Sequence, residues 1–184
     1  LTLGTGIGGG LIIDGKLYRG SNFAAGELGN FSIDYQGPEN TYGLKGALEC
    51  YMGNKQICDL AEKEFIDMKM PDGSWTPERV TDLALEGNAA AIAIWDQIAD
   101  WLASALASTA WLLNPDAFVV GGGVAKAGHF LFDPLTEKIK NQVSDVISND
   151  LKILPAFFGN ESGMIGSSAQ ALDCWKKENN QTSS

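Results

Sequence analysis

Residues that build covalent or metal-linked frameworks are scarce in this sequence. The 184 residues include three cysteines, Cys50, Cys58 and Cys174, and one histidine, His129. The cysteines are odd in number and never form a C-x-x-C pair, so neither a disulfide framework nor a cysteine zinc site is indicated. This usage is typical of a reducing compartment, and we expect a cytoplasmic protein. His129 is expected to be a loop residue rather than a catalytic base.

Basic residues and long apolar runs are also few. The chain has 13 Lys and Arg against 23 Asp and Glu, a net charge of −10, and no cluster of basic residues. Nucleic acids and anionic membranes bind to such clusters, so we expect neither partner. We expect no signal peptide, and the longest apolar stretch, residues 101–113, is broken by serines and flanked by Asp100 and Asn114-Pro115. That pattern does not predict a transmembrane helix.

Glycine, by contrast, is abundant and occurs in two informative runs. The first is Gly4-Thr5-Gly6-Ile7-Gly8-Gly9-Gly10, and the second, Gly121-Gly122-Gly123, follows the apolar residues 117–120. Such runs let the backbone turn sharply and present N–H groups to an anion. The first run alone could equally relieve crowding in a twisted strand. The second run favours two phosphate-binding loops with one nucleotide between them.

The first run contains G-x-G-x-x-G, the pattern of dinucleotide-binding βαβ units. That fold requires a helix to begin at the loop. Here an apolar segment, an Asp14-Gly15 turn and a second strand-like segment follow instead, over residues 11–18. This is the pattern of a β-hairpin, and it argues against a Rossmann domain.

Periodicity and capping residues predict one α/β unit without internal linkers or repeats. The Leu1-Thr2-Leu3 segment resembles a strand already in progress, so we expect the chain to be a fragment of a longer protein. The remaining predicted elements are strands near 31–33, 118–120 and 152–154, helices over 45–65, 77–85, 89–113, from 133 or 134 to 147 and from 163, and a polar disordered tail over 177–184.

The helix predicted over residues 89–113 is apolar except for one narrow stripe. Asp96, Asp100, Ser104 and Ser108 recur at every fourth position. We interpret the stripe as the solvent-facing edge rather than as a catalytic surface. A helix this apolar is buried either in the core or against a second subunit, so a homodimer is plausible.

Carboxylates near the first glycine run form the clearest polar constellation. Glu27 and Asn30 lie in the segment Gly26-Glu27-Leu28-Gly29-Asn30, and Glu49 follows at some distance in the sequence. Carboxylates hold sugar hydroxyls through charge-assisted hydrogen bonds, so a polyhydroxyl ligand would suit them. On spacing alone, each glutamate could equally be a solvated surface residue.

Five motifs, taken in order and with their spacing, resemble the C-terminal lobe of the ROK family, which contains bacterial sugar kinases and sugar-responsive repressors. The resemblance extends to about residue 175. The motifs are the first glycine run, Ala24-Ala25-Gly26-Glu27-Leu28-Gly29-Asn30, Gly43-Leu44-Lys45-Gly46-Ala47-Leu48-Glu49, Asn114-Pro115-Asp116 with Gly121-Gly122-Gly123-Val124, and Gly159-Asn160-Glu161-Ser162-Gly163-Met164-Ile165-Gly166.

The resemblance implies an RNase H-like, actin-like ATPase fold, with residues 1–176 forming the second of two lobes. It implies that Glu27, Asn30 and Glu49 bind sugar hydroxyls. It places Gly4, Thr5 and Gly6 at the ATP phosphates and Gly121, Gly122 and Gly123 beside the adenosine. The general base and the first phosphate loop would lie upstream, which leaves no catalytic residue in this chain.

One departure from the family concerns a structural zinc site. The resemblance places its four ligands, one histidine and three cysteines, at Asn30, Asn40, Tyr42 and Ala47. Because all four ligands are absent, we predict no bound zinc. Packing of Phe31, Tyr42 and Leu44 is expected to hold the loop instead.

These observations predict an ATP- and Mg²⁺-dependent hexose kinase of the glucokinase type. The rival hypothesis is the effector-sensing domain of a sugar-responsive repressor, which an upstream helix-turn-helix would reveal. A third reading is an inactive sugar-binding lobe.

Overall fold

The computed structural model describes residues 1–68 and 74–181. Its elements are six strands, six α-helices and four 3-10 helices (η) within those ranges. In chain order they are β1 (Thr2–Leu3), β2 (Ile7–Gly8), β3 (Leu11–Ile13), β4 (Lys16–Tyr18), η1 (Leu28–Asn30), η2 (Leu48–Cys50), α1 (Asn54–Glu64), α2 (Pro77–Leu85), α3 (Ala89–Leu113), β5 (Ala117–Val120), η3 (Val124–Ala127), α4 (His129–Lys140), α5 (Asp145–Ser148), β6 (Lys152–Pro155), η4 (Gly159–Glu161) and α6 (Ser162–Gln181).

Short strands at the centre of the molecule run side by side in the order β6, β5, β1, β2. Strands β5 and β6 pair in parallel, and β1 and β2 pair antiparallel. Two backbone hydrogen bonds link the pairs, from Leu3 N to Gly121 O (2.8 Å) and from Gly121 N to Leu1 O (2.9 Å). Strand β1 therefore runs parallel to β5, and the loops after both strands lie at the same edge.

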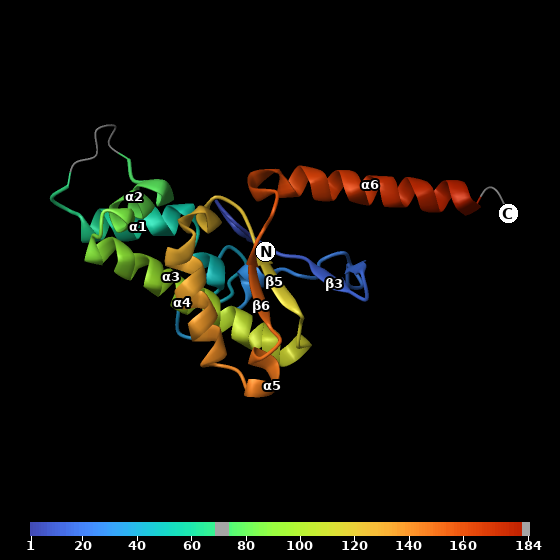
Figure 1. Ribbon diagram of the computed structural model, residues 1–184, viewed down its shortest axis with the longest axis horizontal. Helices are drawn as coiled ribbons and strands as arrows, with labels where there is room; N and C mark the ends of the chain where they lie inside the picture. The colour runs from blue at the N-terminus through green and yellow to red at the C-terminus, as the bar shows by residue number, and fades with distance from the viewer. Residues whose placement is uncertain (69–73, 182–184) are drawn as a thin grey trace.

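Helix α3 is the central helix of the core and has the predicted bounds. Trp95, Leu102 and Leu106 on α3 are fully buried, as are Leu131 and Leu135 on α4. Helices α1, α2 and α4 pack against it (Figure 1). The chain's own core thus accounts for the burial predicted for this helix, which offers no separate argument for a second subunit.

Polar caps begin two of these helices. Thr76 Oγ1 accepts a hydrogen bond from Arg79 N (3.3 Å) ahead of Pro77, and Asn88 Oδ1 accepts from Ala90 N (3.0 Å) and Ala91 N (3.1 Å). Such caps satisfy N–H groups that have no partner within the helix.

The polar stripe of α3 faces helix α4 at one point. Lys138 Nζ lies 3.1 Å from Asp96 Oδ2 and 2.8 Å from Asp100 Oδ1. Both carboxylates are more than half exposed. The hydrogen bond with Asp100 is the main cause that raises the pKa of Lys138. The acidic end of the stripe is therefore a partly exposed contact between two helices.

The hairpin predicted over residues 11–18 is confirmed. Strands β3 and β4 pair from Leu11 with Tyr18 to Ile13 with Lys16, across the Asp14-Gly15 turn. No helix opens at the first glycine run, which confirms the argument against a Rossmann unit.

Two predictions about elements were wrong in detail. The strand near 31–33 is a single antiparallel bridge between Ser32 and Ala47. The helix over 45–65 begins only at Asn54, because Lys45 and Ala47 form bridges to Glu39 and Ser32 that a helical backbone could not make. Residues 48–50 form the separate turn η2.

The helix predicted up to residue 147 is divided in two. It begins at His129, in agreement with the prediction that it starts at 133 or 134 at the latest, and ends at Lys140, with Pro134 inside it. His129 is therefore the first residue of α4 and not a loop residue. A break follows at residues 141–144, where Gln142 O accepts a hydrogen bond from Trp111 Nε1 (3.0 Å), and α5 begins after it. The turn predicted around residues 71–73 lies outside the described residues.

Helix α6 extends away from the other helices (Figure 1). It continues to Gln181, so the segment expected to be a disordered tail from 177 is helical up to that residue, and residues 182–184 lie outside the description. Its described side chains from Gly163 onward are exposed. Within the described chain, no helix has both the length and the apolar character needed to cross a membrane.

Candidate functional site

The two glycine runs meet at one edge of the sheet. Gly4, Thr5 and Gly6 follow β1, and Gly121, Gly122 and Gly123 follow β5, its parallel neighbour. Gly122 has a φ of +91°, and a Cβ atom at this position would lie 2.2 Å from the carbonyl oxygen of Leu3. The close approach of the two loops therefore requires glycine at 122.

Backbone N–H groups on both loops lack protein acceptors. Among the described residues, the N–H groups of Thr5, Gly6, Gly122 and Gly123 form no hydrogen bond. Thr5 and Gly6 are exposed, and Gly122 and Gly123 are half-buried. Adjacent, unpaired N–H groups of this kind form anion-binding concavities. The arrangement can hold phosphate oxygens.

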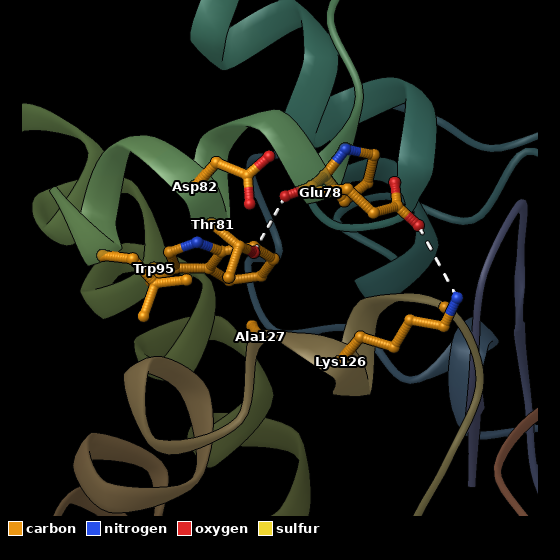
Figure 2. A pocket seen from close by; sticks show the side chains of 9 residues that line it. Glu78, Thr81, Asp82, Trp95, Lys126 and Ala127 are labelled. Carbon is orange, nitrogen blue, oxygen red and sulfur yellow. Dashed lines mark hydrogen bonds and ion pairs between the residues drawn. The ribbon is translucent and has the colours of Figure 1, made fainter.

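A cavity of about 230 Å³ begins beside Gly123 and extends between α2 and η3 (Figure 2). Glu78 and Lys126 face each other across it, 4.0 Å apart. Trp95 of α3 forms part of its wall, and the indole Nε1 is buried without a hydrogen-bond partner among the described residues. Leaving a buried N–H group without an acceptor costs about 1–3 kcal/mol of desolvation free energy. An acceptor atom on a ligand would offset this cost.

The polar constellation is built by η1 and η2. Backbone hydrogen bonds join the two turns, from Leu48 N to Phe31 O (2.8 Å) and from Ile33 N to Gly46 O (2.9 Å). Turn η1 packs on β2 so closely that a Cβ atom at Gly29 would lie 2.5 Å from Ile7 O. The constellation is therefore held next to the first glycine run.

Asn30 and Glu49 are brought together through a third residue, Asn40. Asn40 Nδ2 donates to Asn30 Oδ1 (2.8 Å) and to Glu49 Oε1 (3.2 Å). Asn30 and Glu49 are half-buried, whereas Glu27, which precedes η1, is exposed. Glu27 is tied to the group through its backbone, since Asn30 N donates to Glu27 O (3.1 Å).

Residues directly after Glu49 anchor η2 to the core. Tyr51 donates its hydroxyl to Asp34 Oδ2 (3.0 Å), and its ring lies 5.4 Å from the ring of Trp101 on α3. Burial, followed by this hydrogen bond, raises the pKa of Tyr51. Burial and then the charge of Glu49 raise the pKa of Cys50, so the thiol stays protonated at neutral pH. Both side chains act as neutral packing groups.

The first glycine run also contacts the segment after η2. Asn54 N, at the start of α1, donates to Gly4 O (2.8 Å). Neighbouring contacts thus link the cavity beside Gly123, the two glycine loops and the segment that carries Glu49. These contacts bring together a cavity, unpaired backbone N–H groups and a cluster of polar side chains.

Comparison with known proteins identifies the family of this chain. The model of the ROK family matches residues 1–174. The chain belongs to the ROK family. It is 29% identical over 177 residues to the glucokinase of Thermotoga maritima, covering 92% of this chain and 56% of that protein. Repressors are more distant: the xylose repressor of Bacillus subtilis is 22% identical over 173 residues, 94% of this chain and 43% of the repressor.

Solved structures agree with the family assignment. A ROK family glucokinase from Streptomyces griseus, in complex with glucose and AMPPNP, matches with a TM-score of 0.83 and 27% identity over 92% of this chain and 58% of that one. This confirms the α/β sugar-kinase fold of the actin-like ATPase type. The ROK chain spans about half the length of these relatives.

The four positions that the resemblance assigns to zinc ligands do not fit a zinc ion. They hold two carboxamides, a phenol and a methyl group, at Asn30, Asn40, Tyr42 and Ala47, and Ala47 is fully buried. The described residues contain no group of three or more His, Cys, Asp or Glu that could hold a metal ion.

Hydrogen bonds, rather than the predicted packing, hold this loop. Tyr42 is 82% exposed and Leu44 is 39% exposed, so the expectation that both pack was wrong. Phe31 does pack against the core. Asn40 Oδ1 instead accepts from Tyr42 N and Leu44 N, both at 3.0 Å.

Two residues of the site were missed by sequence reasoning. Asn40 was noted only at the position of an absent zinc ligand. Asparagine side chains commonly accept a hydrogen bond from the backbone N–H two residues later and so form turns, and this tendency was the available signal. Trp95 lies among apolar residues of α3, and nothing in the sequence marks its indole N–H as unpartnered.

Proposed function

We propose that the complete protein transfers a phosphoryl group from ATP to a hydroxyl of a hexose, glucose or a close relative, and that this chain is its C-terminal lobe. The observation that carries the proposal is the order of three neighbouring features: the cavity, the loops with unpaired N–H groups, and the polar cluster of Asn30, Asn40 and Glu49. This order matches base, phosphates and sugar in a kinase complex. The similarity to glucokinases at about 30% identity supports it.

In this proposal the cavity beside Gly123 takes the adenine end of ATP. A ring nitrogen of the base would accept a hydrogen bond from Trp95 Nε1, and Gly121–Gly123 would border the ribose. The phosphates would receive hydrogen bonds from Thr5 and Gly6. Mg²⁺ would enter with ATP and neutralise charge on the phosphates during transfer.

The sugar lies, in this proposal, against Glu27, Asn30 and Glu49. Their hydrogen bonds would fix the sugar so that one hydroxyl faces the terminal phosphate, and such positioning supplies much of the catalysis in phosphoryl transfer. The base that accepts the hydroxyl proton would come from the other lobe. A cytoplasmic location and a homodimer remain predictions from the sequence.

The second candidate function is the effector domain of a sugar-responsive repressor, which the similarity to the xylose repressor favours. A sensor needs the sugar cluster but not the phosphate loops. The unpaired N–H groups on both loops therefore favour the kinase.

A coupled assay of ADP formation on the complete protein tests the kinase proposal, with hexoses and N-acetylhexosamines as substrates. We expect sugar-dependent turnover in the unaltered protein. The double variant Glu27→Ala, Glu49→Ala should lose at least two orders of magnitude in kcat/KM, because each carboxylate hydrogen bond contributes about 1.5–3 kcal/mol. Asp145→Ala, at an exposed position on α5, is the control and should retain full turnover. Sugar binding without turnover would move the assignment to the sensor.

A further inference from the structure

The side chain of Asn40 uses its full hydrogen-bonding capacity. Its oxygen accepts from Tyr42 N and Leu44 N (3.0 Å each), and its nitrogen donates to Asn30 Oδ1 (2.8 Å) and Glu49 Oε1 (3.2 Å). A carboxamide has two donor hydrogens and two acceptor lone pairs. The side chain therefore joins a tight turn of the backbone to two residues of the proposed sugar site.

The backbone determines which way this side chain points. An N–H group can only donate, so Asn40 must turn its oxygen toward Tyr42 N and Leu44 N and its NH₂ group toward Asn30 and Glu49. Asn30 must then turn its own oxygen toward Asn40. The oxygen and nitrogen of an asparagine amide are hard to tell apart by shape, and the hydrogen-bond network assigns them.

The turn itself is held independently of the site. Asn40 N donates to Leu44 O (2.9 Å), and Gly43 N donates to Asn40 O (3.0 Å). Asn40 is half-buried, and Tyr42 and Leu44 contribute only their backbone atoms to it. The donor group of Asn40 is thus fixed before any ligand arrives.

We infer that Asn40 is a positioning residue that sets the hydrogen-bond polarity of the sugar site. With Asn30 Oδ1 and Glu49 Oε1 occupied, Asn30 offers its NH₂ group as a donor and Glu49 offers its second oxygen as an acceptor. That pair suits a hydroxyl group that accepts from Asn30 and donates to Glu49. This inference rests on the proposed function, because it takes Asn30 and Glu49 as sugar-binding residues.

The variant Asn40→Asp tests this role with little change of shape. An aspartate keeps an oxygen for Tyr42 N and Leu44 N, so the turn should form and Tm should stay close to that of the unaltered protein. Its second oxygen would face Asn30 Oδ1 and Glu49 in place of a donor. We expect the Kd for the sugar to rise about 10- to 100-fold at pH 8, with the Kd for ATP unchanged.

A pH series separates positioning from general damage. Lowering the pH from 8 to 5 increases the protonated fraction of the introduced carboxyl, whose pKa the adjacent Glu49 carboxylate should raise. Protonation restores one O–H donor, so the difference in sugar Kd between the variant and the unaltered protein should shrink. A structural defect would not be reversed in this way. Asn149→Asp, which adds the same charge at an exposed residue after α5, is the matched control and should bind sugar normally at both pH values.

Calorimetric titration of the complete protein with glucose, mannose and N-acetylmannosamine provides the readout, alongside turnover. An unchanged sugar Kd in Asn40→Asp, or equal losses for sugar and ATP that do not recover at pH 5, would overturn the inference. Sugar binding without turnover would overturn the kinase proposal only, and the ratio of Kd values would still decide the role of Asn40. If the unaltered protein bound none of these sugars, both would be overturned.

Discussion

At the scale of single residues, Gly122 holds the two glycine loops at their observed separation. Its φ of +91° and the 2.2 Å approach of a Cβ atom to Leu3 O leave no room for a side chain. A Cβ atom added at the neighbouring Gly123 would have no atom within 4 Å, and Gly123 has a φ of −61°, which any residue can adopt. The two adjacent glycines therefore have different roles, one in the contact between strands and one beside the cavity.

Replacement of each glycine by alanine tests this difference. Gly122→Ala should lower the free energy of unfolding by roughly 1–3 kcal/mol, because β1 must move or the backbone must strain. Gly123→Ala should leave it within about 0.5 kcal/mol. Chemical denaturation of the complete protein gives both values. Equal stabilities for the two variants would contradict the account of Gly122.

Single residues also show the limits of sequence reasoning. The runs at residues 4–10 and 121–123 could be recognised as functional loops from the sequence, because so many adjacent glycines usually serve a tight turn or a close backbone contact. The role of Asn40 was not, because its partners Asn30 and Glu49 are ten and nine residues away and meet it only after the turn at 40–44 forms. The sequence offers the tendency of asparagine to form turns, but it does not reveal these two partners.

At the scale of elements, the segment from η1 to η2 keeps its shape through hydrogen bonds. Besides the two backbone bonds between the turns, Ser32 Oγ donates to Lys45 O (2.7 Å) and Gly46 N donates to Pro38 O (2.8 Å). These contacts lie where the resemblance predicts a metal-bound loop. The segment is therefore organised without a metal donor set.

Removal of metal tests the organisation of this segment. The purified protein should contain substoichiometric zinc, and excess EDTA should leave Tm unchanged in thermal denaturation. A structural zinc site contributes directly to folding free energy, so its removal would lower Tm. One zinc per chain, together with a chelator-induced fall in Tm, would contradict the prediction.

Elements differed in how well the sequence predicted them. Helices α2 and α3 were predicted with correct bounds, because Thr76 and Pro77 are strong start signals for α2 and the apolar pattern of α3 is long. The segment over 45–53 was predicted as helix, because apolar residues at helical spacing were present. Pairing of Lys45 and Ala47 with distant residues overrode that pattern, and such pairing leaves no local signal.

At the scale of the whole molecule, the fold brings three features predicted or found in different parts of the chain close together. The cavity at Trp95, the loops after β1 and β5, and the cluster of Asn30, Asn40 and Glu49 are supported by separate elements around one core. Their order follows from the parallel pairing of β1 with β5 and from the packing of η1 on β2. Family membership was predictable from the motifs, whereas this spatial order required the fold.

The most direct test of the central claim is phosphorus NMR of the complete protein incubated with ATP, Mg²⁺ and glucose. The account predicts that a sugar phosphate signal grows as ATP is converted to ADP, at equal rates and only when sugar is present. ATP that stays intact, or that yields only inorganic phosphate with glucose and with the other hexoses, would contradict the account.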